Sequence, residues 1–270
     1  MAAYEGVLRR NILSGYLKMI TAKISSYSRF AIDGINHLLW PAVCSGCSKN
    51  ISEQNSGLCD ECWLAIQSCV GSDYCPRCGR DVSRYAMTGG YCPLCQNEDY
   101  HFDGIARAGI YGQSLSQLIL KFKNDGTELK QFLGKLVKTA LETCVFYEEI
   151  EVFAPVPLHW LRRLSRGYNQ SFLMAKAIRP KGIKISADLV RIRYTEQQAG
   201  CNTFSQRAKN VKGAFAVRKG HRFTGKTVCL VDDIKTSGAT LNECAKVLKD
   251  AGASKVFAAV IAVAGQDKWN

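Results

Sequence analysis

Two adjacent carboxylates, Asp232 and Asp233, follow an apolar run at 228–231 and precede a loop of hydroxyl residues and glycine. The apolar run predicts a buried strand of an α/β sheet, which would place the carboxylates at its carboxyl end, where ligands bind. A carboxylate pair repels phosphate but accepts ribose hydroxyls, directly or through hydrated Mg²⁺. The loop offers backbone N–H groups, hydroxyls and a helix N-terminus to a phosphate dianion. The sequence therefore predicts a sugar-phosphate site, whose phosphate-binding residues would be Lys235, Thr236, Ser237, Gly238, Ala239 and Thr240; an ordinary strand, turn and capped helix is the alternative.

Eight of the thirteen cysteines form four Cys-x-x-Cys pairs. Two intervening residues let both thiolates of a pair face one tetrahedral ion, and two pairs complete a closed structural Zn²⁺ site. The spacing allows one or two zincs and allows the pairs to combine in sequence order or alternately; we favour sequence order. A disulfide framework is the alternative, but it is typical of secreted chains, and no signal peptide is visible. The predicted ligands are Cys44, Cys47, Cys59, Cys62, Cys75, Cys78, Cys92 and Cys95.

Positive charge is concentrated in one part of the chain, whose net charge is +13. Between Pro155 and Lys226, sixteen Lys and Arg stand against only Asp188 and Glu196. Such a stretch attracts polyanions, and charge alone does not choose between a small pyrophosphate compound and a nucleic-acid backbone. Arginine presents forked donors that suit pyrophosphate oxygens, and three arginines follow a predicted strand exit: Arg162, Arg163 and Arg166.

Residues 194–215 form a long polar stretch in which no regular element is predicted. Loops of this length are typically functional lids or mobile insertions. As a lid, the stretch would close over a substrate, exclude water and bring Arg207 to a leaving group. His159 has the chemistry to orient or protonate a substrate, although a lone histidine in a loop is more often a surface residue.

Strands and helices alternate along the rest of the chain, which predicts an α/β fold with a mainly parallel sheet flanked by helices. The predicted strands cover residues 102–111, 151–156, 189–193, 228–231 and 256–263, and the predicted helices cover 114–122, 128–144, 170–178 and 239–251.

We expect three parts: a leader at 1–39, a zinc module at 40–98 and the α/β domain at 99–266. Apolar residues in the leader are spaced four and three apart, which predicts an amphipathic helix that packs on the protein itself or, alternatively, on a membrane surface or partner. No apolar run is long enough for a transmembrane span. Thirteen cysteines without a signal peptide favour the reducing cytoplasm. The leader's apolar stripe comprises Leu13, Leu17, Ile20, Ile24 and Tyr27.

The acidic pair with its Thr-Ser-Gly loop resembles the signature of the type I phosphoribosyltransferases, which use phosphoribosyl pyrophosphate (PRPP). The whole set of motifs is similar to the ComF family, a zinc-finger-bearing phosphoribosyltransferase-like family. The resemblance covers roughly residues 38–264 and leaves out the leader. It is carried by the four cysteine pairs, Lys121-Phe-Lys, Pro155-Val-Pro, Arg166-Gly-Tyr-Asn-Gln, Thr195 to Gln198, Arg207 with Asn210 to Phe215, and Asp232 to Thr240.

The resemblance implies a cytoplasmic protein linked in many bacteria to natural transformation, acting on incoming single-stranded DNA. It implies that Asp232 and Asp233 hold the ribose hydroxyls, that residues 236–240 hold the 5′-phosphate, and that a loop at 157–166 holds the pyrophosphate. Ser237 stands where many members have threonine, a change that keeps the hydroxyl.

Two hypotheses from different classes remain. In the first, the protein is an enzyme that binds Mg²⁺ and PRPP, and catalysis comes from positioning and electrostatics; no acceptor pocket can be read in the sequence. In the second, it is a non-catalytic module that binds single-stranded DNA phosphates, with stacking on Tyr168, Phe172, Tyr194 or Phe204. A zinc-held adaptor for DNA-uptake or recombination proteins is a third hypothesis.

Overall fold

The computed structural model describes residues 43–51, 57–71, 73–96, 98–124, 129–195 and 203–265. The predicted leader helix lies outside these ranges. The chain divides into two compact units, residues 1–59 and 60–270. In the first unit, Val43 and Asn50 form an antiparallel bridge around the first cysteine pair. No helix of the described ranges is long and apolar enough to cross a membrane.

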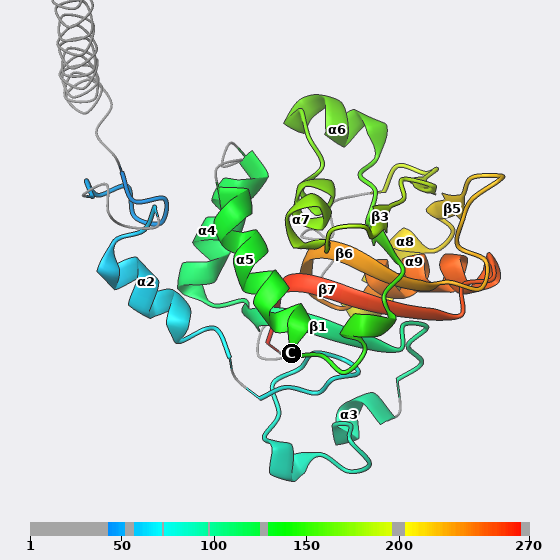
Figure 1. Cartoon of the computed structure of the whole chain (residues 1–270), viewed down its shortest axis with the longest axis horizontal. Coiled ribbons are helices and arrows are strands. Elements are labelled where there is room, and N and C mark those ends of the chain that lie inside the picture. The colour runs from blue at the N-terminus through cyan, green and yellow to red at the C-terminus, as the bar shows by residue number, and fades with distance from the viewer. Residues whose placement is uncertain are drawn as a thin grey trace, which may run out of the picture. The chain divides into compact units, whose positions relative to one another are not determined.

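The second unit is built on a five-stranded sheet in which all neighbouring strands are parallel (Figure 1). The strand order is β1-β7-β6-β2-β3, which confirms the predicted parallel sheet. The central strand β6 is fully buried from Val228 to Val231. The strands are β1 (Gly104–Ile110), β2 (Val152–Pro155), β3 (Lys184–Ile185), β6 (Thr227–Lys235) and β7 (Lys255–Val263).

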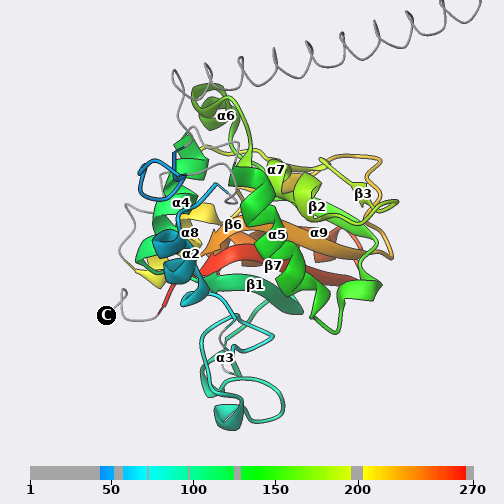
Figure 2. The ribbon, with the colours of Figure 1, turned by 60° about the vertical axis from the view of Figure 1, so that its left-hand side comes forward.

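Helices cover both faces of this sheet (Figures 1 and 2). On one face, α5 (Leu129–Glu142) and α7 (Gln170–Ile178) pack against β1, β2 and β6, with α4 (Gln113–Asn124) and α2 (Asp60–Gln67) beside them. On the other face, α9 (Ala239–Asp250) contacts β6 and β7 and packs against α8 (Phe204–Val211). A small antiparallel pair, β4 (Leu189–Arg191) and β5 (Phe215–Val217), lies beside α9, and α3 (Pro93–Gln96) belongs to the second cysteine region.

Three sequence predictions need correction. The strand with the acidic pair does not end at Val231 but continues to Lys235, because its pairing with β7 extends to that residue. The predicted loop at 157–166 contains a helix, α6 (Trp160–Arg166), capped by His159 and ended by Gly167 with φ 75°. The predicted irregular stretch at 194–215 contains α8, which begins with a capping box between Thr203 and Gln206.

Candidate functional site

A pocket of about 450 Å³ opens at the carboxyl edge of the sheet, where β2 and β6 end. Asp232 and Asp233 come from β6, and Thr236 and Thr240 come from the following loop and the first turn of α9. Cationic side chains from four other elements line the same space: Lys123, Arg162, Arg166, Arg191 and Arg207. The pocket therefore brings an acidic pair, two hydroxyl groups and five cations together.

The acidic pair is held by hydrogen bonds that fix both carboxylates. Asp232 Oδ1 accepts from the Ser171 hydroxyl at 3.0 Å and from the backbone N–H of Asp233 at 3.0 Å. Asp233 Oδ2 lies 3.0 Å from the Lys123 ammonium, and its Oδ1 accepts from the N–H of Ile234 at 2.7 Å. Burial and the charge of Asp233 raise the pKa of Asp232 to about 7. One carboxylate is thus paired with a cation, and the other is poised to ionise near neutral pH.

The raised pKa of Asp232 has a consequence for stability. Because the unfolded pKa is about 4, ionisation of Asp232 is disfavoured in the fold, and stability decreases as pH rises from 4 through 7. Asp232→Asn should therefore stabilise the unliganded protein at pH 8 by roughly 2 kcal/mol and have little effect at pH 4. The effect at pH 8 is moderate because solvent reaches part of the Asp232 side chain. Urea unfolding of both proteins at several pH values measures this difference; a constant difference would contradict it.

The segment Tyr168-Asn-Gln170 joins α7 to α4 and so positions the acidic pair's partners. The Tyr168 hydroxyl donates to Phe122 O at 2.6 Å, and Gln170 Nε2 donates to Lys123 O at 3.0 Å. Asn169 caps α7 by accepting from the N–H of Ser171 at 3.0 Å, and its amide donates to Val156 O at 3.1 Å. These bonds position Lys123 next to Asp233 and Ser171 next to Asp232.

The predicted phosphate loop divides between three environments. Thr236 and Thr240 face the main pocket. Ser237, Gly238 and Ala239 line a second pocket of about 400 Å³ beside Tyr100 and Asn242. Lys235 points into the protein, where it is 2% exposed and its ammonium lies 5.5 Å from the centroid of the Tyr100 ring. Burial lowers the pKa of Lys235 to about 8, and the Arg80 cation contributes to this shift.

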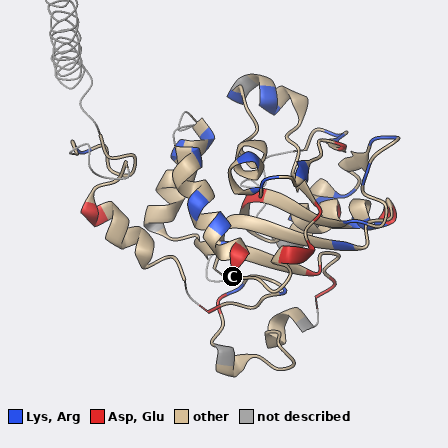
Figure 3. Cartoon of the chain, viewed as in Figure 1, with Lys and Arg blue, Asp and Glu red and all other residues tan. Residues whose placement is uncertain are grey.

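Three of the predicted arginines line the pocket. Arg162 donates to Thr195 O at 2.8 Å, and its guanidinium lies over the Tyr194 ring. Arg207 is 3% exposed, and its Nη1 donates to the Thr236 hydroxyl at 2.9 Å. Arg166 also lines the pocket, whereas Arg163 is exposed on α6 and does not. Figure 3 shows the basic residues on α6 and along the loops beside β5.

Sequence reasoning missed three residues of this site: Lys123, Ser171 and Arg191. Arg191 is half-buried, and burial followed by the charge of Arg162 lowers its pKa. Lys123 belongs to the Lys121-Phe-Lys motif, so a signal for it was present. His159 is buried and caps α6, its Nδ1 accepting from the N–H of Leu161 at 3.4 Å, and it is not a surface residue.

The cysteines gather in two groups of four, in sequence order. The sulfurs of Cys44, Cys47, Cys59 and Cys62 all lie within 4.8 Å of one another, as do those of Cys75, Cys78, Cys92 and Cys95. Sulfur pairs of the second group are 3.5 Å apart, close to the roughly 3.8 Å edge of a tetrahedron with Zn–S bonds of about 2.3 Å. None of the described cysteines is in a disulfide. Both groups therefore fit structural zinc.

The parallel sheet, the acidic pair and the hydroxyl loop define the class of protein: a phosphoribosyltransferase-type domain preceded by zinc-binding cysteines. The phosphoribosyl transferase domain family matches residues 173–269, and the double zinc ribbon domain family matches residues 35–96.

Three bacterial relatives cover most of the chain. Competence protein F of Haemophilus influenzae is 32% identical over 221 residues, which are 79% of this chain and 93% of the relative. Competence protein ComFC of Streptococcus pneumoniae is 28% identical over 76% of this chain and 87% of its own length. DNA utilization protein YhgH of Escherichia coli K12 is 26% identical over 80% of this chain and 94% of its own length. The chain belongs to the ComF family.

Proposed function

We propose that the main pocket binds PRPP together with Mg²⁺. The observation that carries this proposal is that one pocket brings together the carboxylates of Asp232 and Asp233, two threonine hydroxyls and several arginines. Carboxylates accept ribose hydroxyls, a helix N-terminus with hydroxyl groups suits the 5′-phosphate, and forked guanidinium groups suit pyrophosphate. The pocket thus offers a suitable partner to each of the three parts of PRPP.

In a phosphoribosyl transfer, each group of residues in the pocket would have its own role. The two aspartates orient the ribose through its hydroxyls, and Lys123 and Ser171 fix their rotamers. Arg162 and Arg166 stabilise the negative charge that develops on departing pyrophosphate. Arg207 ties α8 to Thr236 and adds a cation next to the phosphate loop. Mg²⁺ would neutralise negative charge on the substrate, and Asp232 and Asp233 are the residues that would hold its hydrated form.

The arginine assignment gives a test of this proposal. Arg162→Gln and Arg166→Gln should each weaken PRPP binding about tenfold or more, because each removes a charge-assisted hydrogen bond to pyrophosphate. Ribose 5-phosphate, which lacks the pyrophosphate, should bind all variants like the wild type. Arg163→Gln is the matched control, since Arg163 lies on the same helix but does not line the pocket. Equal losses for both ligands, or a loss in the control, would refute the assignment.

The biological role we propose is cytoplasmic handling of incoming single-stranded DNA during competence. It is supported by the names of the relatives, which are competence and DNA utilization proteins. In this role, PRPP binding and DNA handling are compatible, because a nucleotide 5′-phosphate has the same chemistry as the ribose phosphate of PRPP.

A second candidate function is binding of single-stranded DNA by the surface next to the arginines. Trp160 is 61% exposed and Tyr194 is 51% exposed, and both rings lie near His159, with Arg162 over Tyr194. Base stacking on such rings contributes about 1–3 kcal/mol each. Of the predicted stacking residues, Tyr168 and Phe172 are partly buried and engaged with Phe122 and Lys176. Affinity for an oligonucleotide should fall steeply with salt and drop in Trp160→Ala/Tyr194→Ala; salt-insensitive or absent binding would exclude this function.

A further inference from the structure

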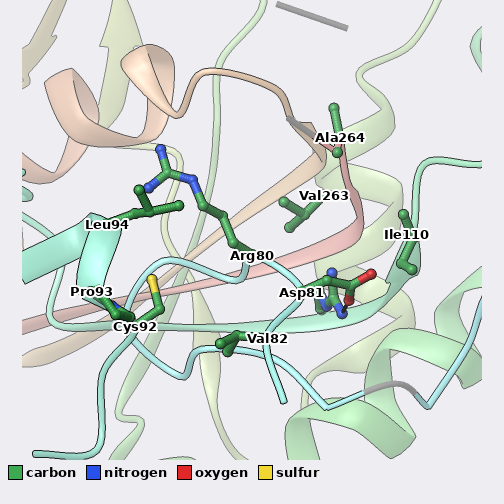
Figure 4. A pocket seen from close by; sticks show the side chains of 11 residues that line it. Arg80, Asp81, Val82, Cys92, Pro93, Leu94, Ile110, Val263 and Ala264 are labelled. Carbon is green, nitrogen blue, oxygen red and sulfur yellow. Dashed lines mark hydrogen bonds and ion pairs between the residues drawn. The ribbon is translucent and has the colours of Figure 1, made fainter. Parts of the chain in front are cut away.

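Two buried cations lie near the phosphate loop: Lys235 precedes it, and Arg80 pairs with Glu98, which lines the pocket beside Ser237 and Gly238. Lys235 is 2% exposed and Arg80 is 8% exposed. Arg80 Nη2 pairs with Glu98 Oε1 at 2.5 Å, whereas Arg80 Nη1 is buried with no hydrogen-bond partner. Figure 4, a view of a pocket of about 490 Å³ next to the second cysteine group, shows Arg80 extending past Leu94 and away from Asp81. The buried guanidinium therefore does not pair with Asp81, whose carboxylate binds Arg107.

Glu98 does not offset both buried cations, and the second cysteine group is a further source of negative charge close to them. The Lys235 ammonium lies 5.5 Å from the centroid of the Tyr100 ring, and Tyr100 packs against the four cysteines of the second group. Glu98 alone offsets one of the two cations, and burying an unpaired charge is costly. Four thiolates around Zn²⁺ carry a net charge of −2, whereas two disulfides would carry none. A zinc-thiolate cluster thus supplies the negative charge that the site lacks.

Lys235 also supports the phosphate loop mechanically. Gly238 has φ 83°, and a Cβ built there would lie 2.9 Å from Lys235 Cε and 3.4 Å from its Nζ. The stem of Lys235 therefore fills the space under the turn whose neighbours Thr236 and Thr240 face the main pocket. Residues between the cysteine group and the loop form a second link, since the His101 N–H donates to Asn242 Oδ1 at 2.6 Å and Asn242 Nδ2 donates to Asp99 O at 3.1 Å.

We propose that Lys235 is a positioning residue that couples the second zinc cluster to the phosphate loop. Its ammonium is compensated by the cluster, and its stem holds the loop in the shape that receives phosphate. Loss of zinc from this cluster leaves the Lys235 ammonium uncompensated, so the lysine moves and the loop moves with it. The inference rests on the proposed function for the identity of the phosphate ligand. The coupling between Lys235 and the second zinc cluster does not depend on that function.

The test measures how fast the second cluster loses zinc when the Lys235 ammonium is removed by substitution. Zinc-replete, full-length wild type and Lys235→Met are treated with a chelator and N-ethylmaleimide, and alkylation of each cysteine is followed by mass spectrometry. We expect alkylation of the second group, Cys75 to Cys95, to be at least fivefold faster in Lys235→Met, a typical coupling between sites, while the first group serves as the internal reference. Lys255→Met, an exposed lysine on the same sheet, is the control and should behave like the wild type.

A second variant changes the other partner of the contact between Lys235 and Gly238. Gly238→Ala places a Cβ against Lys235 and should also accelerate alkylation of the second group. Gly220→Ala is the matched control, because Gly220 has φ 75° but open space around its Cα. Wild-type alkylation rates in folded Lys235→Met and in Gly238→Ala would overturn the inference, even if PRPP binds. Faster alkylation without any PRPP binding would uphold the coupling and refute only the proposed function.

Discussion

Replacing Asp232 and Asp233 together by asparagine should weaken PRPP binding by at least about a hundredfold, because two charge-assisted contacts to the ribose or its hydrated Mg²⁺ are lost. Asparagine keeps the shape of both side chains, so the Ser171 bond and the backbone bonds within the strand can persist. Lys123 loses its ion-pair partner but lies beside open pocket space. Calorimetric titration with PRPP and Mg²⁺ measures the change directly.

The control for the acidic pair is Glu149→Gln/Glu151→Gln, which also converts two carboxylates to amides. Both glutamates are exposed and pair with surface lysines, Lys255 and Lys226, away from the pocket residues. The control should bind PRPP like the wild type. Zinc content and a cooperative unfolding transition should be retained in both double variants. Unchanged PRPP affinity in the aspartate variant would refute the assignment of the pair.

Cys78→Ser should remove one zinc per chain and lower the melting temperature by about 10 °C. Cys78 is fully buried in a cluster with the other three cysteines of its group, against Val82 and Tyr100. Loss of a structural metal ranks among the largest single-residue effects, and about 3–5 kcal/mol corresponds to that shift in a domain of this size. Metal analysis and thermal unfolding measure the two quantities.

The comparison variant is Cys47→Ser in the first group, where the cysteine is exposed. We expect this variant also to lose one zinc, because each group of four would hold one ion, but to lose less stability. The wild type should contain two zincs per chain. Full zinc content in Cys78→Ser, or disulfide-linked peptides in the wild type, would contradict the two-cluster account.

The parts of the site that lie close together in the sequence could be predicted, because their chemistry is local. The acidic pair, its hydroxyl loop and the following helix are contiguous, and their order alone indicates a sugar-phosphate site. Lys123, Ser171 and Arg191 could not be found in this way, because each comes from a separate element and reaches the aspartates or the pocket only after the sheet has formed.

Other differences have distinct physical reasons. Spacing allowed two pairings of the cysteine knuckles, and only the tertiary structure selects sequence order. Helix α6 was missed because Trp160, Leu161 and Leu164 are all exposed, so its apolar residues mark no buried face. Helix α8 had a usable signal, since Thr203 and Gln206 have the spacing of a capping box. Lys235 looked like part of the phosphate loop, but it extends from the end of β6 toward Tyr100.

A calorimetric titration of zinc-replete wild-type protein with PRPP, with and without Mg²⁺, tests most directly whether the main pocket binds PRPP. We expect saturable binding at one site per chain, and we expect Mg²⁺ to strengthen it. Absence of binding under both conditions would mean that this pocket is not a PRPP site.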